Sequence, residues 1–168
     1  MQTYSVQGPW AGRLAIIPRP RGSDWLDDDI AELRKQGFDL IVSLLTPNEA
    51  HDLGLDMEQE LSRKHGLVFS NVPIVDMGVP DSTEDVLAVL NRLEKALSGR
   101  RNVAVHCRQG IGRSGLLTAA LLVISGLEPE AALQRVSAAR GLAIPETREQ
   151  KEWVIKLARE FAGPAIRG

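Results

Sequence analysis

A single thiol lies in a segment whose neighbouring residues are suited to binding an anion. The segment reads VHCRQGIGRSG and contains Cys107, the one cysteine of the 168-residue chain. Arg113 follows in the same segment, and its planar guanidinium can bind two oxygens of a phosphate at once. Gly110 and Gly112 let backbone N–H groups approach an anion closely. These residue types predict a nucleophile inside a phosphate-binding loop.

The surroundings of Cys107 also favour its thiolate, which is the nucleophilic form of cysteine. Backbone N–H groups, a helix N-terminus, Arg113 and the hydroxyl of Ser114 would all stabilise negative charge on the sulfur. The alternative is a buried, inert cysteine at the end of a core strand, which is common for a lone cysteine. That alternative explains Cys107 but none of the residues that follow it.

The loop lies between a predicted strand and a predicted helix. NVAVH at 102–106 is typical of a buried strand, and residues 113–125 have the apolar face of a helix. In open α/β sheets, ligands bind beyond the carboxyl ends of the strands. We therefore expect Cys107 at the carboxyl edge of a sheet, in a strand–phosphate loop–helix unit.

The rest of the chain predicts the sheet and helices that must position this loop. Short β-favouring runs occupy 13–17, 39–45, 67–72 and 102–106. Helical patterns occupy 25–36, 56–65 and 82–97 before the cysteine, and 113–125, 128–139 and 147–161 after it. This order predicts an α/β fold with a central, mostly parallel sheet flanked by helices and an all-helical C-terminal part. No linker or repeat divides the chain, so one domain over residues 1–168 is expected.

Composition excludes several function classes. The net charge is −2 with both signs interspersed, which predicts no general affinity for nucleic acid and no stable membrane association. The longest apolar run, Gly115–Ile124, is too short to span a bilayer, and the N-terminus lacks a secretory signal pattern. One cysteine allows no internal disulfide and disfavours a structural zinc site. A cytoplasmic protein that needs no metal is expected.

The residues His106, Cys107, Arg113 and Ser114 resemble, at these spacings, the H-C-x-x-G-x-x-R-[ST] signature of the cysteine-based protein tyrosine phosphatase superfamily. The order of segments over 72–153 is similar to that of compact dual-specificity phosphatases of the kinase-associated type and of small microbial tyrosine phosphatases. The first seventy residues match only in the order of strands and helices. The resemblance implies a cofactor-free phosphatase that cleaves phosphotyrosine in proteins through a phosphocysteine intermediate, with phosphoserine and phosphothreonine as candidate further substrates.

The same resemblance implies a role for each residue of the loop. Cys107 would be the nucleophile, Arg113 would hold the phosphate, and the Ser114 hydroxyl would help the thiolate leave in the second step. His106 would organise the loop. The residues expected to contact phosphate are Arg108, Gln109, Gly110, Ile111, Gly112 and Arg113. The expected partners are a phosphorylated protein or peptide, and phosphate or other oxyanions in the loop.

Cleavage of a phosphate ester also needs an acid on another loop, because an unprotonated alkoxide or phenoxide is a poor leaving group. The turn-rich segment VPIVDMGVPD offers Asp76 and Asp81. Asp76 falls where the resembled family places its general acid. Asp81 or Ser82 is typical of a helix N-cap, so Asp81 is expected to be structural.

The hydrolysis of a phosphocysteine requires a positioned water molecule. The resembled families use a Q-T-x-x-Q segment, whereas this chain has Glu146 in place of the first glutamine and retains Gln150. A carboxylate near a phosphate dianion would be repelled, so we expect Glu146 on the surface near a helix start. Gln150 is the candidate for positioning the water, with a purely structural role in the helix as the alternative.

Three alternative functions use a similar loop. Phosphoinositide phosphatases carry two basic loop residues, but here Arg108 is basic and Ile111 is not. Rhodanese-type sulfurtransferases also place a cysteine in an anion-binding loop, but the loop glycines, the Arg113–Ser114 pair and Asp76 argue against them. A pseudophosphatase that only binds phosphoproteins usually lacks the cysteine, the arginine or the acid, and all three are present.

Overall fold

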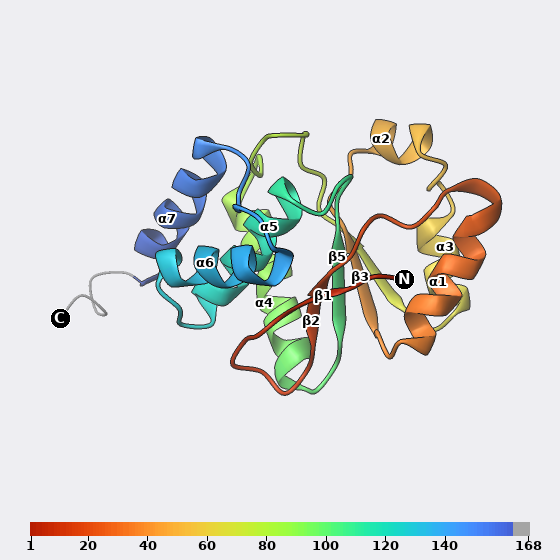
Figure 1. Cartoon of the computed structure of the whole chain (residues 1–168), viewed down its shortest axis with the longest axis horizontal. Helices are drawn as coiled ribbons and strands as arrows, with labels where there is room; N and C mark the ends of the chain where they lie inside the picture. The colour runs from red at the N-terminus through yellow and green to blue at the C-terminus, as the bar shows by residue number, and fades with distance from the viewer. Residues whose placement is uncertain (163–168) are drawn as a thin grey trace.

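A five-stranded sheet passes through the centre of the molecule (Figure 1). The computed structural model describes residues 1–162. The strands are β1 (Tyr4–Val6), β2 (Leu14–Ile16), β3 (Leu40–Ser43), β4 (Val68–Asn71) and β5 (Val103–His106). They lie in the order β1-β2-β5-β3-β4, and all neighbouring pairs are parallel except β1 with β2. The predicted mostly parallel sheet is confirmed.

The antiparallel edge strand β1 was not predicted from the sequence. It has only three residues, and two of them are partly or fully exposed. Such a short segment carries too few residues for an alternating pattern to stand out. Its pairing with β2 extends the sheet beyond the four predicted strands.

Helices cover both faces of the sheet (Figure 1). On one face lie α1 (Leu26–Lys35), which follows a short 3-10 turn at Ser23–Trp25, and α3 (Glu58–Lys64). On the other face lie α4 (Thr83–Ser98), α5 (Gly112–Ile124), α6 (Pro129–Arg140) and α7 (Arg148–Ala162). The short helix α2 (Pro47–Asp52) lies near the edge of the sheet where β5 ends. The predicted all-helical part after Cys107 is confirmed. Within residues 1–162, none of the helices is both long and apolar enough to cross a membrane.

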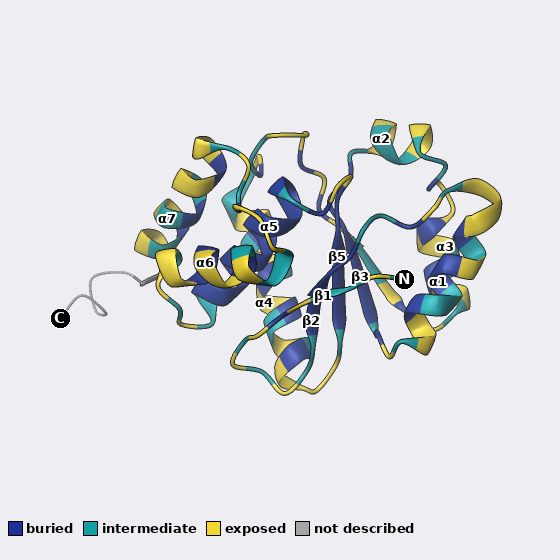
Figure 2. Cartoon of the chain, in the orientation of Figure 1, coloured by how far each residue is buried: buried dark blue, intermediate teal, exposed yellow. Residues whose placement is uncertain are grey.

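The central strands are buried on both sides, so each face of the sheet contributes to a separate core (Figure 2). Ala15, Ile41 and Ala104 belong to the core beneath α1 and α3. Their neighbours Val42 and Val105 belong to the larger core beneath α4 to α7. This alternation follows from the two-residue period of a strand and explains why these strands are continuous apolar runs.

Helix α5 is buried all round, although the sequence predicted a helix with one apolar face. Every residue from Gly112 to Val123 is buried. Three of them, Arg113, Ser114 and Thr118, are polar. A buried polar side chain costs free energy unless it is hydrogen-bonded, so Arg113 must find partners inside the protein.

Helix α2 is the second element that the sequence analysis missed. Thr46 and Glu49 form a capping box, in which each side chain bonds the backbone N–H of the other, and Pro47 begins the helix. The pattern T-P-x-E is a recognisable helix start, but six residues give no apolar periodicity. Helix α2 places Glu49 at the candidate active site.

Candidate active site

Cys107 lies directly after β5, in a loop that closes around its sulfur. The backbone N–H of Gly110 donates to Cys107 Sγ over 3.2 Å. Gly110 has φ of +72°, and a Cβ added there would lie 3.3 Å from the backbone oxygen of Ile17. A side chain at this position would therefore be both strained and crowded. The glycine lets the loop turn its N–H group toward the thiol.

The loop forms the floor of a pocket of about 200 Å³. Its lining comprises Asp76, Met77, Cys107, Arg108, Gln109, Gly112, Arg113 and Glu146. Cys107 is 2% exposed, so the pocket is the route by which a substrate would reach it. Gly110 and Ile111 do not line the pocket; the Ile111 side chain packs against the core instead. Ile111 can contact a phosphate only through its backbone.

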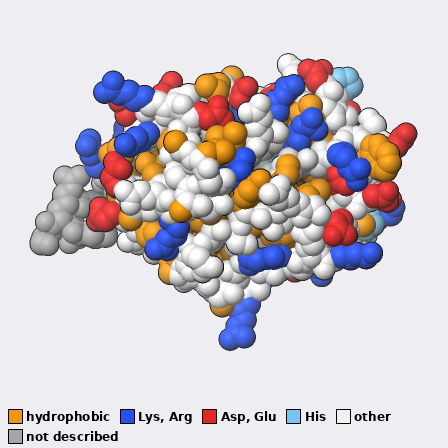
Figure 3. Space-filling view, viewed as in Figure 1, with side chains coloured by type: hydrophobic (Ala, Val, Ile, Leu, Met, Phe, Trp, Pro, Cys, Tyr) orange, Lys and Arg blue, Asp and Glu red, His pale blue; other side chains and the backbone are white. Residues whose placement is uncertain are grey.

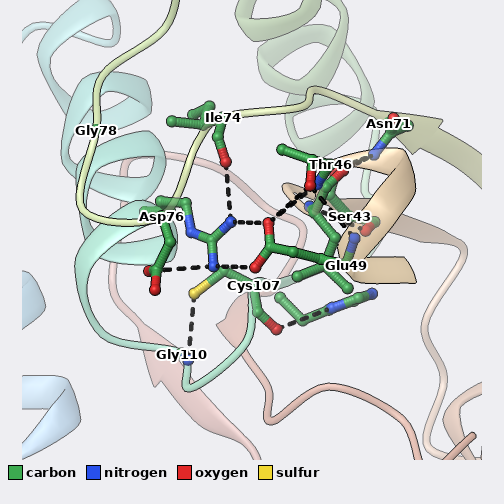
Figure 4. A network of polar contacts seen from close by, with 12 residues as sticks. Ser43, Thr46, Glu49, Asn71, Ile74, Asp76, Gly78, Cys107 and Gly110 are labelled. Carbon is green, nitrogen blue, oxygen red and sulfur yellow. Dashed lines mark hydrogen bonds and ion pairs between the residues drawn. The ribbon is translucent and has the colours of Figure 1, made fainter. Parts of the chain in front are cut away.

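Arg113 is almost completely buried and is held by two other elements (Figure 4). Its Nη1 donates to Glu49 Oε1 over 2.7 Å, and its Nη2 donates to Glu49 Oε2 over 3.0 Å. Nη1 also donates to the carbonyl of Ile74 over 2.8 Å. These contacts fix the plane of the guanidinium. Within residues 1–162, no protein acceptor engages Nε, which is thus available to a ligand.

The sequence analysis missed Glu49 as a partner of Arg113. The capping pattern around Thr46 predicts a helix start but does not say which residue the carboxylate faces. Hydrogen bonds from Arg113 hold the pKa of Glu49 below its ordinary value of 4.5, against the opposing effect of burial. Burial would lower the pKa of Arg113, but Glu49 and the charge of Cys107 outweigh it and raise that pKa. The pair stays ionised.

We expect the Glu49–Arg113 pair to make stability depend on acid pH. Because the pKa of Glu49 is lowered on folding, its carboxylate stabilises the folded state above pH 4.5, and this contribution is lost as pH falls through the lower, folded value. The free energy of unfolding of wild type should therefore fall more steeply below pH 4.5 than that of Glu49→Gln. Urea unfolding at pH values from about 3 to about 7 measures both slopes. Exposed Glu60→Gln is the control and should follow wild type; equal slopes for Glu49→Gln and wild type would contradict the assignment.

Asp76 lies at the pocket and Asp81 does not. Asp76 Oδ1 is 3.3 Å from Arg113 Nη2, and the Asp76 side chain is 62% exposed. It is thus placed on the pocket wall beside Arg113. Ser82, not Asp81, caps α4: its hydroxyl accepts from the N–H of Asp85 over 3.2 Å. The structure therefore places Asp76 at the pocket and gives the helix cap to Ser82 rather than to Asp81.

His106 is tied to the protein at both ring nitrogens. Its Nε2 lies 2.6 Å from Glu58 Oε1, and its Nδ1 lies 3.3 Å from the carbonyl oxygen of Cys107. Both side chains are buried. A carbonyl oxygen only accepts, so a hydrogen bond at Nδ1 requires the ring to donate there, and Nε2 faces the Glu58 carboxyl. His106 therefore anchors the backbone at Cys107, which fits the predicted organising role. No pattern in the sequence indicated Glu58 as its partner.

Ser114 is fully buried at the start of α5. Within the described part of the chain, Ser114 Oγ has no hydrogen-bond partner. The expected contact between this hydroxyl and the resting thiolate is therefore not present. Its role in the second chemical step stays a prediction.

Glu146 and Gln150, the two residues considered for water positioning, differ in burial and in their partners. Glu146 is exposed, but it also lines the pocket, where its Oε1 accepts from the N–H of Gly112 over 3.0 Å. Gln150 is fully buried: its Nε2 donates to the carbonyl of Gly78 and its Oε1 accepts from the N–H of Thr147. Both ends of the Gln150 amide are thus engaged, and the bond from Nε2 ties α7 to the loop that carries Asp76. Gln150 is better placed to hold that loop than to bind a water.

Arg140 is another residue that the sequence did not single out. Its Nε donates to the carbonyl of Gly110 over 2.7 Å, and its guanidinium lies over the ring of Tyr4 at 4.1 Å. The contact holds the backbone of the loop at Gly110 and adds a positive charge near it. Arg108 and Gln109 are exposed on the pocket rim.

Comparison with known proteins gives one consistent result. A family model described as "Polymorphic toxin system, DSP-PTPase phosphatase" matches residues 16–127. The chain is 26% identical over 139 residues to cyclin-dependent kinase inhibitor 3 of Rattus norvegicus, a match that covers 82% of this chain and 65% of the rat protein. The chain therefore spans less than two thirds of that relative's length.

Solved structures show the same architecture. Kinase associated phosphatase (KAP), with its catalytic site cysteine replaced by serine, superposes with a TM-score of 0.86 at 20% identity and 97% coverage of both chains. Tk-PTP in the active form superposes with a TM-score of 0.75 at 30% identity, covering 95% of this chain and 99% of that chain.

Proposed function

The chain belongs to the DSP-PTPase family of cysteine-based phosphatases, and on this basis we propose that it hydrolyses phosphotyrosine in proteins through a phosphocysteine intermediate. One observation carries the proposal. Cys107 and Arg113 from one loop and Asp76 from another line one pocket of about 200 Å³. Transfer of a phosphoryl group to sulfur requires a nucleophile, a cationic group that binds the phosphate oxygens, and an acid.

In the first step, the Cys107 thiolate attacks phosphorus. The S–P bond forms as the P–O bond to the tyrosyl oxygen breaks, and that oxygen takes a proton from Asp76. The loop N–H groups and Arg113 stabilise the charge on the phosphoryl oxygens. Because Asp76 Oδ1 contacts Arg113 Nη2 at rest, phosphate oxygens must replace it there. The exposed Asp76 side chain is then free to reach the leaving oxygen.

In the second step, a water molecule attacks the phosphocysteine. The new P–O bond forms as the S–P bond breaks, and the electron pair returns to Cys107. Asp76, now a carboxylate, takes the proton of the water, which follows from microscopic reversibility of the first step. Phosphate then leaves and the thiolate is restored.

Recognition of the phosphate is local rather than spread over the surface. Figure 3 shows acidic and basic side chains interspersed on the face that it draws. With a net charge of −2, the protein has no general attraction for anions. We propose phosphorylated proteins or peptides as substrates, phosphate and other oxyanions as ligands of the loop, and the cytoplasm as the compartment. A lone cysteine that acts as thiolate is suited to reducing conditions.

Turnover of p-nitrophenyl phosphate in EDTA, followed by a substrate panel, tests the proposal. We expect activity that EDTA does not reduce and the highest kcat/KM on a phosphotyrosine peptide. The panel also contains phosphoserine and phosphothreonine peptides and phosphoinositides. Loss of activity in EDTA, or a clear preference for phosphoinositides, would overturn the proposal.

We expect Asp76→Ala to slow cleavage according to how poor the leaving group is. General acid catalysis contributes roughly 10²–10⁴-fold, so phosphotyrosine turnover should fall by about 10² or more. An activated aryl phosphate, whose phenol leaves readily as an anion, should be affected much less. The loss of rate at alkaline pH should also become flatter, because it normally reports loss of the proton from the acid.

Asp81→Ala is the matched control, because Asp81 is a nearby exposed carboxylate that does not line the pocket. Since Ser82 supplies the helix cap, the variant should retain both wild-type stability and the wild-type dependence on leaving group. Steady-state kinetics on aryl phosphates of graded phenol pKa measures that dependence. A steeper dependence in Asp81→Ala, with none in Asp76→Ala, would mean that the wrong acid has been assigned.

A further inference from the structure

Glu146 occupies a hydrogen-bond donor that an oxyanion would use. Gly112 is the first residue of α5, and the first N–H groups of a helix have no partner within the helix. Such groups bind phosphate and sulfate readily. In this protein the N–H of Gly112 already donates to Glu146 Oε1 over 3.0 Å. A carboxylate therefore fills part of the anion-binding loop.

The position of Glu146 is fixed on both sides along the chain. Before it, Ile144 is buried against Gly115, and the N–H of Ile144 donates to Ser137 Oγ over 3.0 Å. After it, Gln150 is fully buried and bonded to the Asp76 loop. The contact between Glu146 and Gly112 is also close, since a Cβ on Gly112 would lie 3.0 Å from Glu146 Oε1. The segment between α6 and α7 thus presents this carboxylate to the loop.

The carboxylates around the pocket, together with the contact between Glu146 and Gly112, weaken the binding of an incoming dianion. Glu49 and Asp76 already lie against Arg113, so Glu146 is a third carboxylate at the site. A phosphate that binds the loop must take the Gly112 N–H from Glu146 or remain close to a like charge. Either requirement lowers its affinity.

We propose that Glu146 is a built-in competing anion: it occupies the Gly112 N–H at rest and withdraws when a phosphate group binds. The proposal rests on the proposed phosphate-binding role of the pocket. The consequence is selectivity for phosphorylated substrates over free oxyanions. A substrate that makes further contacts outside the loop can offset the competition, whereas a free oxyanion cannot. Glu146 therefore limits retention of the product phosphate and of other free oxyanions.

Sulfate binding tests this inference without requiring turnover. Sulfate remains a dianion near neutral pH, so its own charge does not change with moderate pH. Isothermal titration calorimetry at neutral pH compares wild type, Glu146→Gln, Glu146→Ala and the control Glu149→Gln. Glu149 is the next acidic residue in the same segment; it is exposed and does not line the pocket.

We expect both Glu146 variants to bind sulfate about tenfold more tightly than wild type, which is about 1.4 kcal/mol. Glutamine can still accept from the Gly112 N–H, but without a charge it competes less strongly. Glu149→Gln should bind sulfate as wild type does. Unchanged or weaker sulfate binding in both Glu146 variants would overturn the inference.

A parallel kinetic measurement keeps this result separate from the proposed activity. Inhibition of aryl phosphate hydrolysis by inorganic phosphate should also strengthen by about tenfold in Glu146→Gln. If sulfate binds more tightly in the variants but no protein form hydrolyses phosphate esters, the inference holds and the proposed function fails. If hydrolysis occurs and phosphate inhibition is unchanged, the inference fails and the function stands.

Discussion

Replacing Cys107 with serine is expected to abolish turnover while preserving oxyanion binding. Loss of the nucleophile removes the covalent route, so we expect kcat to fall by a factor on the order of 10⁵ or more, as it does when a serine protease loses its nucleophile. The serine hydroxyl is close in size to the thiol and accepts the same Gly110 N–H, so the loop should keep its shape. Because Cys107 is the only cysteine, no other thiol can replace it.

Three measurements decide this prediction together. Turnover of a phosphotyrosine peptide gives the loss of rate, sulfate titration reports the state of the loop, and urea unfolding reports the fold. We expect only the first to change substantially. Turnover within about tenfold of wild type by a correctly folded Cys107→Ser would rule out a mechanism through phosphocysteine.

Replacing Arg113 with lysine is expected to cost roughly 10³-fold or more in kcat/KM, although the positive charge is kept. An arginine that contacts a transferring phosphoryl group is worth about 10³–10⁵ in rate. The guanidinium here makes two bonds to Glu49, one to the Ile74 carbonyl, and retains Nε for a ligand. The ammonium group of lysine carries its donors on one nitrogen, so it cannot hydrogen-bond Glu49 and a phosphate at the same time, as the planar guanidinium can.

The matched control is Arg148→Lys, which changes a highly exposed arginine that forms an ion pair with Glu152. It should leave kcat/KM unchanged. Urea unfolding is needed for Arg113→Lys, because a poorly held Glu49 would also lower stability. If folded Arg113→Lys retained more than about a tenth of the wild-type kcat/KM, the Arg113 guanidinium would not be the phosphate-binding group.

The sequence predicted those parts of the site whose residues lie in one contiguous segment of the chain. The loop from Cys107 to Ser114 combines a buried-strand pattern, glycines and an arginine, and each has a local physical meaning. The same holds for the four parallel strands, because apolar runs between helical patterns indicate buried strands. The proposed chemistry requires an acid on another loop, which left Asp76 and Asp81 as candidates, and the resemblance to the phosphatase family favoured Asp76.

The residues that support the loop could not be found in the same way. Glu49 reaches Arg113 from α2, and Glu58 reaches His106 from α3. Each contact joins segments far apart in the chain and depends on how helices pack at the sheet edge. A capping box or an ordinary acidic helix residue looks the same whether its carboxylate faces solvent or a buried cation. Only the fold distinguishes the two cases.

Glu146 illustrates a different limit of sequence reasoning. The argument that a carboxylate is repelled by a phosphate dianion is correct for the occupied site. At rest, however, the loop presents unpaired N–H groups, and a nearby carboxylate satisfies one of them. The sequence argument considered only the bound state, so it did not expect Glu146 to face the pocket.

Direct detection of the phosphocysteine tests the central claim most closely. Wild-type protein is mixed rapidly with a phosphotyrosine peptide, quenched by denaturation within the first turnover, and digested for peptide mass spectrometry. We predict one phosphoryl group on Cys107, which decays as free phosphate appears and is not formed in Cys107→Ser. Turnover with no phosphorylated Cys107 at any quench time, or with the phosphoryl group on another residue, would contradict the mechanism.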